Sequence, residues 1–263
     1  MITELRQRLL ALQQTSGIEG PGTLSLGVPA LDTVLGGGLV HGALHEIAAR
    51  GEAHVPAAVG FALGVIASSC PALCRAFKED VDGRDKPNHV RRTVLWIAED
   101  MALAESGAPH GAGIDDFGLA SERLVMVTTA HRRDLLWAME EALHCRAVSV
   151  VIGEMRAGGI DGVAARRLSL AAADSGALAL LLRATPSSDA STAATRWIVG
   201  AAPSMTRHSP SAPRFAVHLG RNRYGPVGSW ILEWSDSDER FILATHAQPM
   251  AAPALYRSHR QVA

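Results

Sequence analysis

The sequence predicts an α/β protein with a mostly parallel central sheet, flanked by helices and extended by antiparallel strands near the C-terminus. Three observations lead to this prediction. Short apolar runs between residues 24 and 183 lack the in–out alternation of a half-exposed strand, which indicates strands that are buried on both faces. Helical segments separate these runs, as crossover connections between parallel strands require. After residue 183, short strand-like runs alternate with Gly and Pro turns, a pattern typical of antiparallel pairing.

The elements of the parallel part follow one another in a regular alternation. The first predicted strand, ALHEIA, precedes an apolar helix, and the second, TVLWIA, has apolar residues on both of its faces. Two later strands are each followed by a segment with helical spacing of its apolar residues. Strands are expected at 43–48, 93–98, 124–128, 147–152 and 177–182, and helices at 57–69, 132–144 and 162–174.

The antiparallel extension completes a core domain that spans residues 24–245. Residues 77–92 form a charged insertion in this core, interpreted as a solvated loop because the Gly and Glu spacing of a calcium-binding EF-hand is missing. Residues 246–263 show no clear period and are expected to form a loose tail. The strands of the extension are expected at 196–199, 215–219, 229–234 and 241–244.

An amphipathic helix and a linker, residues 1–23, precede the core. The linker, residues 15–23, is rich in Gly, Pro and Ser, so the helix can stand apart from the core. A helix of this length is marginally stable alone in water. We therefore expect it to dock on its own domain or on a partner. Its apolar stripe consists of Ile2, Leu5, Leu9 and Leu12.

Composition excludes several classes of protein. The 25 basic residues nearly balance the 26 acidic ones, so net charge alone cannot drive binding to nucleic acid. An apolar content of 48% argues against a disordered chain. Three cysteines without a signal peptide fit a cytoplasmic protein. No apolar run reaches 18 residues, so no membrane span is expected.

The motifs of metal enzymes and hydrolases are incomplete. Cys70 and Cys74 have no second pair at zinc spacing, and we interpret them as buried thiols. His45 and Glu46 begin a zinc-protease motif, but Ala49 stands where its second histidine belongs. No serine lies in the G-x-S-x-G turn of a hydrolase. No metal site is therefore expected.

The segment from Leu24 to Ala67 carries the most informative pattern. Its glycine run precedes a strand, whereas a dinucleotide-binding glycine loop follows a strand and opens a helix. The order of turn, glycine run, strand and loop resembles instead the start of a RecA-type ATPase core. The residues that carry this resemblance are Leu31, Asp32, Leu35, Gly36, Gly37, Gly38, Leu39 and Gly42.

The resemblance implies a phosphate-binding loop at residues 49–58, where the sequence is ARGEAHVPAA. A P-loop needs two glycines, a lysine for the β- and γ-phosphates and a hydroxyl for Mg²⁺. Gly51 can supply the first glycine, but Glu52 follows it, and Pro56 removes a backbone donor. Both lysines of the chain lie within residues 77–92, so no shift of the alignment supplies one. No cofactor is expected, and weak ATP binding at the helix N-terminus remains open.

Two acidic residues lie near the positions of the groups that act on ATP in RecA-like proteins. Glu99 ends the second strand, at the position of the glutamate that activates water, and Glu154 lies one residue after the position of the metal-binding aspartate. The lysine, the hydroxyl and the aspartate are lost together, and with them most of the electrostatic stabilisation of phosphoryl transfer. Both glutamates are interpreted as vestigial, and no catalytic residue is assigned.

Later motifs narrow the resemblance to one family. Over residues 24–244 the chain resembles ImuA, the RecA-like accessory protein of bacterial damage-induced mutagenesis. The motifs are TRWIV at 195–199, APS at 202–204, RNR at 221–223 and GSWILEW at 228–234. The resemblance implies a role in error-prone translesion synthesis in the SOS response. The implied partners are ImuB (a catalytically inactive Y-family polymerase relative), RecA or a RecA–DNA filament, and, through ImuB, an error-prone C-family polymerase.

Between residues 183 and 223, six arginines stand against one acidic residue, Asp189. Such a local excess suits phosphate contacts and predicts binding to single-stranded DNA, to a filament or to a protein partner. Pairing of the arginines with acidic residues in 224–245 is the alternative. Trp197 and Tyr224 are the candidates for base stacking. The candidate DNA- or partner-binding residues are Arg183, Arg196, Arg207, Arg214, Arg221, Asn222 and Arg223, of which 221–223 resemble the basic–Asn–basic motif of RecA.

The sequence therefore favours a non-catalytic RecA-like adaptor or regulator of an error-prone translesion polymerase assembly, with the N-terminal helix as its partner-binding element. A DNA-stimulated ATPase with a non-standard phosphate loop is one alternative, with Glu99 as base and Glu154 at the metal. A cell-division inhibitor of the SulA type, which shares a distant RecA-like core and binds FtsZ, is the other.

Overall fold

The computed structural model describes residues 22–69, 93–156, 158–187, 189, 191–203 and 212–244. Several features predicted from the sequence lie outside the described residues. They are the N-terminal helix with Ile2, Leu5, Leu9 and Leu12, the linker up to residue 21, the thiols of Cys70 and Cys74, the insertion 77–92, the tail 246–263 and Arg207.

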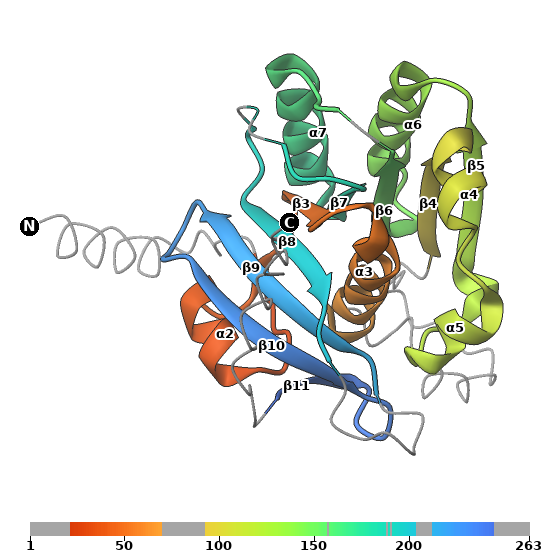
Figure 1. Cartoon of the computed structure of the whole chain (residues 1–263). Helices are drawn as coiled ribbons and strands as arrows, with labels where there is room; N and C mark the ends of the chain where they lie inside the picture. The colour runs from red at the N-terminus through yellow and green to blue at the C-terminus, as the bar shows by residue number, and fades with distance from the viewer. Residues whose placement is uncertain are drawn as a thin grey trace, which may run out of the picture.

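A nine-stranded sheet crosses the described part of the chain in the order β11-β10-β9-β8-β3-β7-β6-β4-β5 (Figure 1). The six strands from β8 to β5 are parallel, and β9, β10 and β11 extend one edge with antiparallel pairs. This arrangement confirms the predicted fold class. The strands are β3 (Leu44–Ala49), β4 (Thr93–Glu99), β5 (Leu124–Thr129), β6 (Val148–Met155), β7 (Leu178–Arg183), β8 (Thr195–Ala201), β9 (Arg214–Asn222), β10 (Gly228–Ser235) and β11 (Arg240–Leu243).

One strand differs from the expectation. The sequence analysis assigned the run at 196–199 to the antiparallel extension, yet β8 runs parallel to β3 and antiparallel to β9. The antiparallel part therefore begins at β9. Strand direction depends on the path of the connection from β7, which the local sequence pattern does not encode.

Helices cover both faces of the parallel part (Figure 1). On β7, Leu178, Leu180 and Leu182 join the core under α3, whereas Ala179 and Leu181 join the core under α6 and α7. We call these the α3 face and the α6/α7 face. The helices are α2 (Pro29–Leu35), α3 (Val55–Ser69), α4 (Asp100–Ser106), α5 (Gly111–Asp116), α6 (Arg132–His144) and α7 (Gly162–Ser175).

The α3 face is closed by aromatic side chains that link α3 to the antiparallel extension. Phe61 of α3 packs against Trp197, Phe215 and Phe241, with ring centroids 5.4 to 6.2 Å apart. One turn further along α3, a Cβ on Gly64 would lie 2.4 Å from the Phe241 ring. This glycine therefore lets the helix approach the sheet, and larger residues there would displace it.

The glycine run that resembles the RecA core forms a turn between α2 and a short hairpin of β1 (Thr23–Leu24) and β2 (Leu39–Val40). Gly36 ends α2 in the left-handed conformation (φ 75°). A Cβ on Gly38 (φ 136°) would lie 2.0 Å from the Leu24 carbonyl oxygen. The backbone at Gly38 therefore approaches β1 so closely that only glycine fits at this position of the turn.

Candidate nucleotide site and arginine-rich surface

The loop that the RecA resemblance assigns to phosphate binding connects β3 to α3. Gly51 is extended (φ 175°), and a short 3-10 turn, η1 (Glu52–His54), leads into α3. The backbone N–H of Arg50 donates to the Val199 carbonyl (2.7 Å), and Nδ1 of His54 accepts a backbone N–H at the end of β8 (3.2 Å). These bonds fasten the loop to β8.

A small cavity lies at the start of α3. It has a volume of about 10 Å³ between that helix and the ends of β6 and β7, which is about the space that one water molecule needs. Residues 50–58 contain no lysine and no hydroxyl side chain, and Glu52 places a negative charge in the short turn before α3. The guanidinium of Arg50 lies beside Gly200 of β8, where a Cβ on Gly200 would meet its Nε at 3.2 Å.

Glu154, near the end of β6, lies in the core of the α3 face. Its Oε2 accepts a hydrogen bond of 2.8 Å from the indole Nε1 of Trp96 in β4. Burial raises the pKa of Glu154, and the bond from Trp96 acts in the opposite direction. Burial thus disfavours the carboxylate form of Glu154, which is the form that binds Mg²⁺.

Glu99, at the end of β4, is 8% exposed and both of its oxygens are occupied. Nε of Arg132, at the start of α6, lies 3.4 Å from Oε1, and the backbone N–H of Arg156 donates to Oε2 (3.0 Å). Arg132 also donates to the Gly159 carbonyl (3.3 Å). Glu99 therefore joins the ends of β4 and β6 to the start of α6.

These contacts place the two glutamates in different surroundings. The partner of Glu154, Trp96, belongs to the core of the α3 face, whereas the partner of Glu99, Arg132, opens a helix of the α6/α7 face. A two-carboxylate site for Mg²⁺ and water would need both groups to address the same phosphate. The described contacts do not bring them together.

A buried ion pair that the sequence analysis missed joins the first residues of β3 and β8. Oε2 of Glu46 in β3 accepts from Nε of Arg196 in β8 (2.9 Å), and the Ser191 hydroxyl donates to Oε1. Arg196 also donates to the carbonyls of Ser187 and Asp189, at 3.1 and 2.7 Å. Glu46 and Arg196 are 150 residues apart, so no local spacing reveals the pair.

Arg183, at the end of β7, is part of the same charge network. Arg183 is 3% exposed, and its Nε has no hydrogen-bond partner among the described residues. Burial lowers the pKa of Arg183, whereas the negative charge of Glu46 raises it. We call Glu46, Ser191, Arg196 and Arg183 the buried charge network.

Other predicted surface residues also make contacts within the fold. Arg214 of β9 pairs with Glu233 of β10, as the alternative interpretation expects for the acids after residue 223. Arg221 donates to the Ser191 carbonyl. Trp197 is 1% exposed and donates its indole N–H to Thr195, so it cannot stack on a base.

The turn between β9 and β10 is the most open part of the predicted surface. Asn222 is internal to the fold, because its amide donates to the carbonyls of Val34 (3.0 Å) and Pro226 (3.1 Å). Arg223 is exposed, and Tyr224 is 49% exposed. Two arginines of the predicted series are thus exposed among the described residues: Arg221, which also donates to the Ser191 carbonyl, and Arg223, beside the exposed ring of Tyr224.

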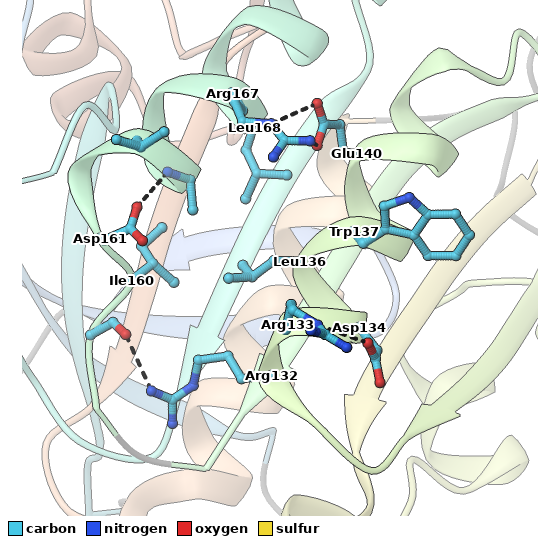
Figure 2. A pocket seen from close by; sticks show the side chains of 13 residues that line it. Arg132, Arg133, Asp134, Leu136, Trp137, Glu140, Ile160, Asp161, Arg167 and Leu168 are labelled. Atoms are coloured by element: carbon cyan, nitrogen blue, oxygen red, sulfur yellow. Dashed lines mark hydrogen bonds and ion pairs between the residues drawn. The ribbon is translucent and has the colours of Figure 1, made fainter.

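A cavity of about 820 Å³ lies between α6 and α7, away from the loop after β3 (Figure 2). Figure 2 shows Leu136 and Ile160 directed toward the space between the two helices. An ion pair between Arg167 and Glu140 crosses one end. We call this feature the α6/α7 groove.

The described residues contain neither a metal-binding cluster nor a helix suited to cross a membrane. No three His, Cys, Asp or Glu side chains in that part of the chain gather as a metal-binding group. None of the helices described there combines the length and apolar character needed to cross a membrane.

The architecture defines the class: a mostly parallel sheet between layers of helices, with antiparallel strands at its C-terminal end, is a RecA-like fold. Among solved structures, the chain is similar to the RadB recombinase, with a TM-score of 0.54 and 13% identity over 83% of this chain and 98% of that chain. At this identity the similarity establishes the fold alone. No protein-family model and no curated protein sequence matches the chain.

Proposed function

We propose that the protein is a non-catalytic RecA-like adaptor that regulates an error-prone translesion polymerase assembly in the bacterial response to DNA damage. The observation that carries the proposal is the loop at residues 50–58, which has neither lysine nor hydroxyl and is bonded to β8. Phosphoryl transfer depends on cations and donors positioned around the transferred group. A RecA-like chain without these cations and donors can still serve as a scaffold for partner proteins.

The two glutamates support the same conclusion. Glu99 is held by Arg132 and by a backbone N–H, and Glu154 is buried against Trp96. A general base needs an oxygen within reach of the attacking water, and these oxygens already accept other bonds. Both groups stabilise the fold in this interpretation.

The partners are proposed from the ImuA resemblance. ImuB is the direct partner, the error-prone C-family polymerase is recruited through ImuB, and a RecA–DNA filament is the site of action in the cytoplasm. In the structure, the motifs at 195–199 and 228–234 form β8 and β10, whose buried tryptophans Trp197 and Trp234 belong to the core. The resemblance therefore includes residues that build the antiparallel extension.

A contact with single-stranded DNA or a filament is proposed at the turn between β9 and β10. Arg223 offers an exposed guanidinium beside the exposed ring of Tyr224. This pair provides the combination of cation and aromatic ring that single strands require. Arg207, outside the described residues, belongs to the same predicted surface.

The test is co-purification with ImuB in three conditions: without nucleotide, with ADP and with ATP and Mg²⁺. A scaffold forms the complex to the same extent in all three. A complex that forms only with ATP would contradict the proposal, because the nucleotide would then control the assembly.

A DNA-stimulated ATPase is the second candidate, favoured by the position of Glu99 at the end of β4. It would need Arg132 to release Glu99 and the loop at 50–58 to leave β8. In that case Glu99→Gln would abolish phosphate release.

A further inference from the structure

We propose that the α6/α7 groove holds residues 2–14 of the same chain when no partner is bound. The apolar stripe of that segment, Ile2, Leu5, Leu9 and Leu12, would fill the space between the two helices. The N-terminal segment is then an internal ligand that a partner must displace. The inference concerns the isolated protein and does not depend on the proposed polymerase assembly.

The groove has an apolar floor and uncovered apolar walls. The ion pair between Arg167 and Glu140 limits it at one end, and Arg132 and Arg133 lie at the other end (Figure 2). Val163 is 70% exposed on α7, and Trp137 is 60% exposed on α6. Uncovered apolar side chains around a hollow are typical of an interaction site. The apolar lining consists of Leu136, Trp137, Ile160, Val163, Ala164 and Leu168.

The described chain begins close to the far end of α7. The carbonyl of Gly22 accepts the N–H of His41 (2.8 Å). At the next residue, a Cβ on Gly42 would lie 3.1 Å from the Ala172 carbonyl oxygen and 3.3 Å from Cα of Gly176. Gly22 therefore lies near the C-terminal end of α7, and the groove lies along the N-terminal half of that helix, up to Leu168.

The lengths fit this path. A helix over residues 2–14 would be about 20 Å long, close to the length of α7 itself. Residues 15–21 can span up to about 23 Å when extended. The segment can thus turn back at Gly22 and lie parallel to α7, with residue 14 toward the C-terminal end of α7, without straining the linker.

The charges of the segment select this direction. In the parallel arrangement, Glu4 lies toward the groove end formed by Arg132 and Arg133, and Arg8 lies toward Glu140. Reversing the segment would bring Arg8 toward Arg132 and Arg133, whereas the other end holds both charges of the pair between Arg167 and Glu140. Opposite charges across a docking surface fix orientation more than they add affinity.

The same chain is favoured over a second copy because the linker is short. A flexible connection of this length raises the local concentration of a tethered segment to the millimolar range. A free second copy at micromolar concentration competes poorly against it. Docking in the same chain also leaves the protein monomeric.

The first test is hydrogen exchange of the full chain, comparing Leu9→Asp with the matched control Leu10→Asp. Leu9 belongs to the apolar stripe and Leu10 lies off it, so the two variants carry the same change in charge and polarity. We expect Leu9→Asp to speed exchange in 132–140 and 162–168 at least about tenfold, and Leu10→Asp to leave it unchanged. Equal exchange in both variants would overturn the proposal.

The second test is a disulfide between the segment and α7. The native cysteines Cys70, Cys74 and Cys145 are replaced by Ser, and Ala164→Cys is combined with Leu9→Cys or with Leu10→Cys. We expect a bond within one chain that forms at least about tenfold faster with Leu9→Cys. Equal rates would overturn the proposal, and a bond that joins two chains would assign the groove to a second copy instead.

Discussion

The two faces of the sheet accommodate titratable groups in opposite ways. On the α3 face, burial favours the neutral forms: it lowers the pKa of His45 to about 4 and raises the pKa of Glu154. On the α6/α7 face, Glu46 and Glu99 have arginine partners instead. Both solutions satisfy buried polar groups. Near the carboxyl ends of β4 and β6, where ligands bind in open α/β sheets, Glu99 and Glu154 thus make contacts within the fold.

The largest expected effect tests the α6/α7 face, where the buried acidic groups have arginine partners. Glu46→Gln leaves Arg196 and Arg183 buried without their negative partner, which we expect to cost about 3–5 kcal/mol of unfolding free energy. Urea denaturation measures this loss. Asp238→Asn is the control, since its pair with Arg240 is exposed (side chains 50% and 55% exposed) and its loss should cost below about 1 kcal/mol. Equal losses in the two variants would remove the distinction between buried and surface pairs.

The next effect tests the α3 face through the pH dependence of stability that His45 causes. The pKa of His45 is about 4 in the folded protein, against 6.5 as its usual value. As the pH falls below 6.5, the unfolded chain takes up this proton first, so stability decreases between pH 6.5 and about 4. The contribution of this group amounts to about 3 kcal/mol. Urea unfolding at pH 7 and pH 4 measures it, and His45→Gln should reduce the difference. An unchanged pH dependence in that variant would show that His45 is not the group responsible.

The pair of Trp96 and Glu154 gives a smaller effect. Trp96→Phe removes the donor to Glu154 and should cost about 1–3 kcal/mol, whereas Glu154→Gln retains an acceptor and should cost less. Because the pKa of Glu154 is raised, its contribution to stability decreases as the pH rises above 4.5. Glu154→Gln should therefore lose less stability than the wild type between pH 5 and pH 8. A larger loss in the variant would mean that Glu154 is ionised in the folded protein.

The smallest expected effect concerns DNA binding by Arg223, which belongs to neither group of buried titratable residues. Arg223→Ala should weaken retention on single-stranded DNA and reduce the salt slope by about one counterion. Arg240→Ala is the matched control, because Arg240 is also exposed but lies on β11, beside Asp238. Salt titration of DNA retention measures both variants. The same slope for Arg223→Ala and wild type would exclude the turn as a phosphate contact.

The sequence predicts the parallel part of the fold closely, because buried strands and amphipathic helices leave local patterns. The helix at 132–144 matches α6 at both ends, and the predicted helix at 162–174 differs from α7 by one residue. The direction of β8 is not predictable in this way, since it depends on pairing with β3. The local periodicity of apolar residues predicts which residues are buried, but it does not predict the order and direction of the strands.

The site was less predictable than the fold. The incomplete phosphate loop is visible in the sequence because a P-loop requires particular residues in one short stretch. The ion pair of Arg196 cannot be predicted from the local sequence, since its partner Glu46 lies in a strand that is distant along the chain. Trp197 likewise follows a basic residue in a polar stretch, yet the α3 face buries it. Partners from distant strands, and not local charge, decide which arginines stay exposed.

The central claim is that the RecA-like fold serves here without ATP turnover, and phosphate release is the measurement that tests it most directly. Wild type and Glu99→Gln are compared with saturating ATP and Mg²⁺, with and without single-stranded DNA. The account predicts that neither protein releases phosphate above the rate in buffer alone. Phosphate release that single-stranded DNA stimulates in the wild type, and that Glu99→Gln abolishes, would contradict it.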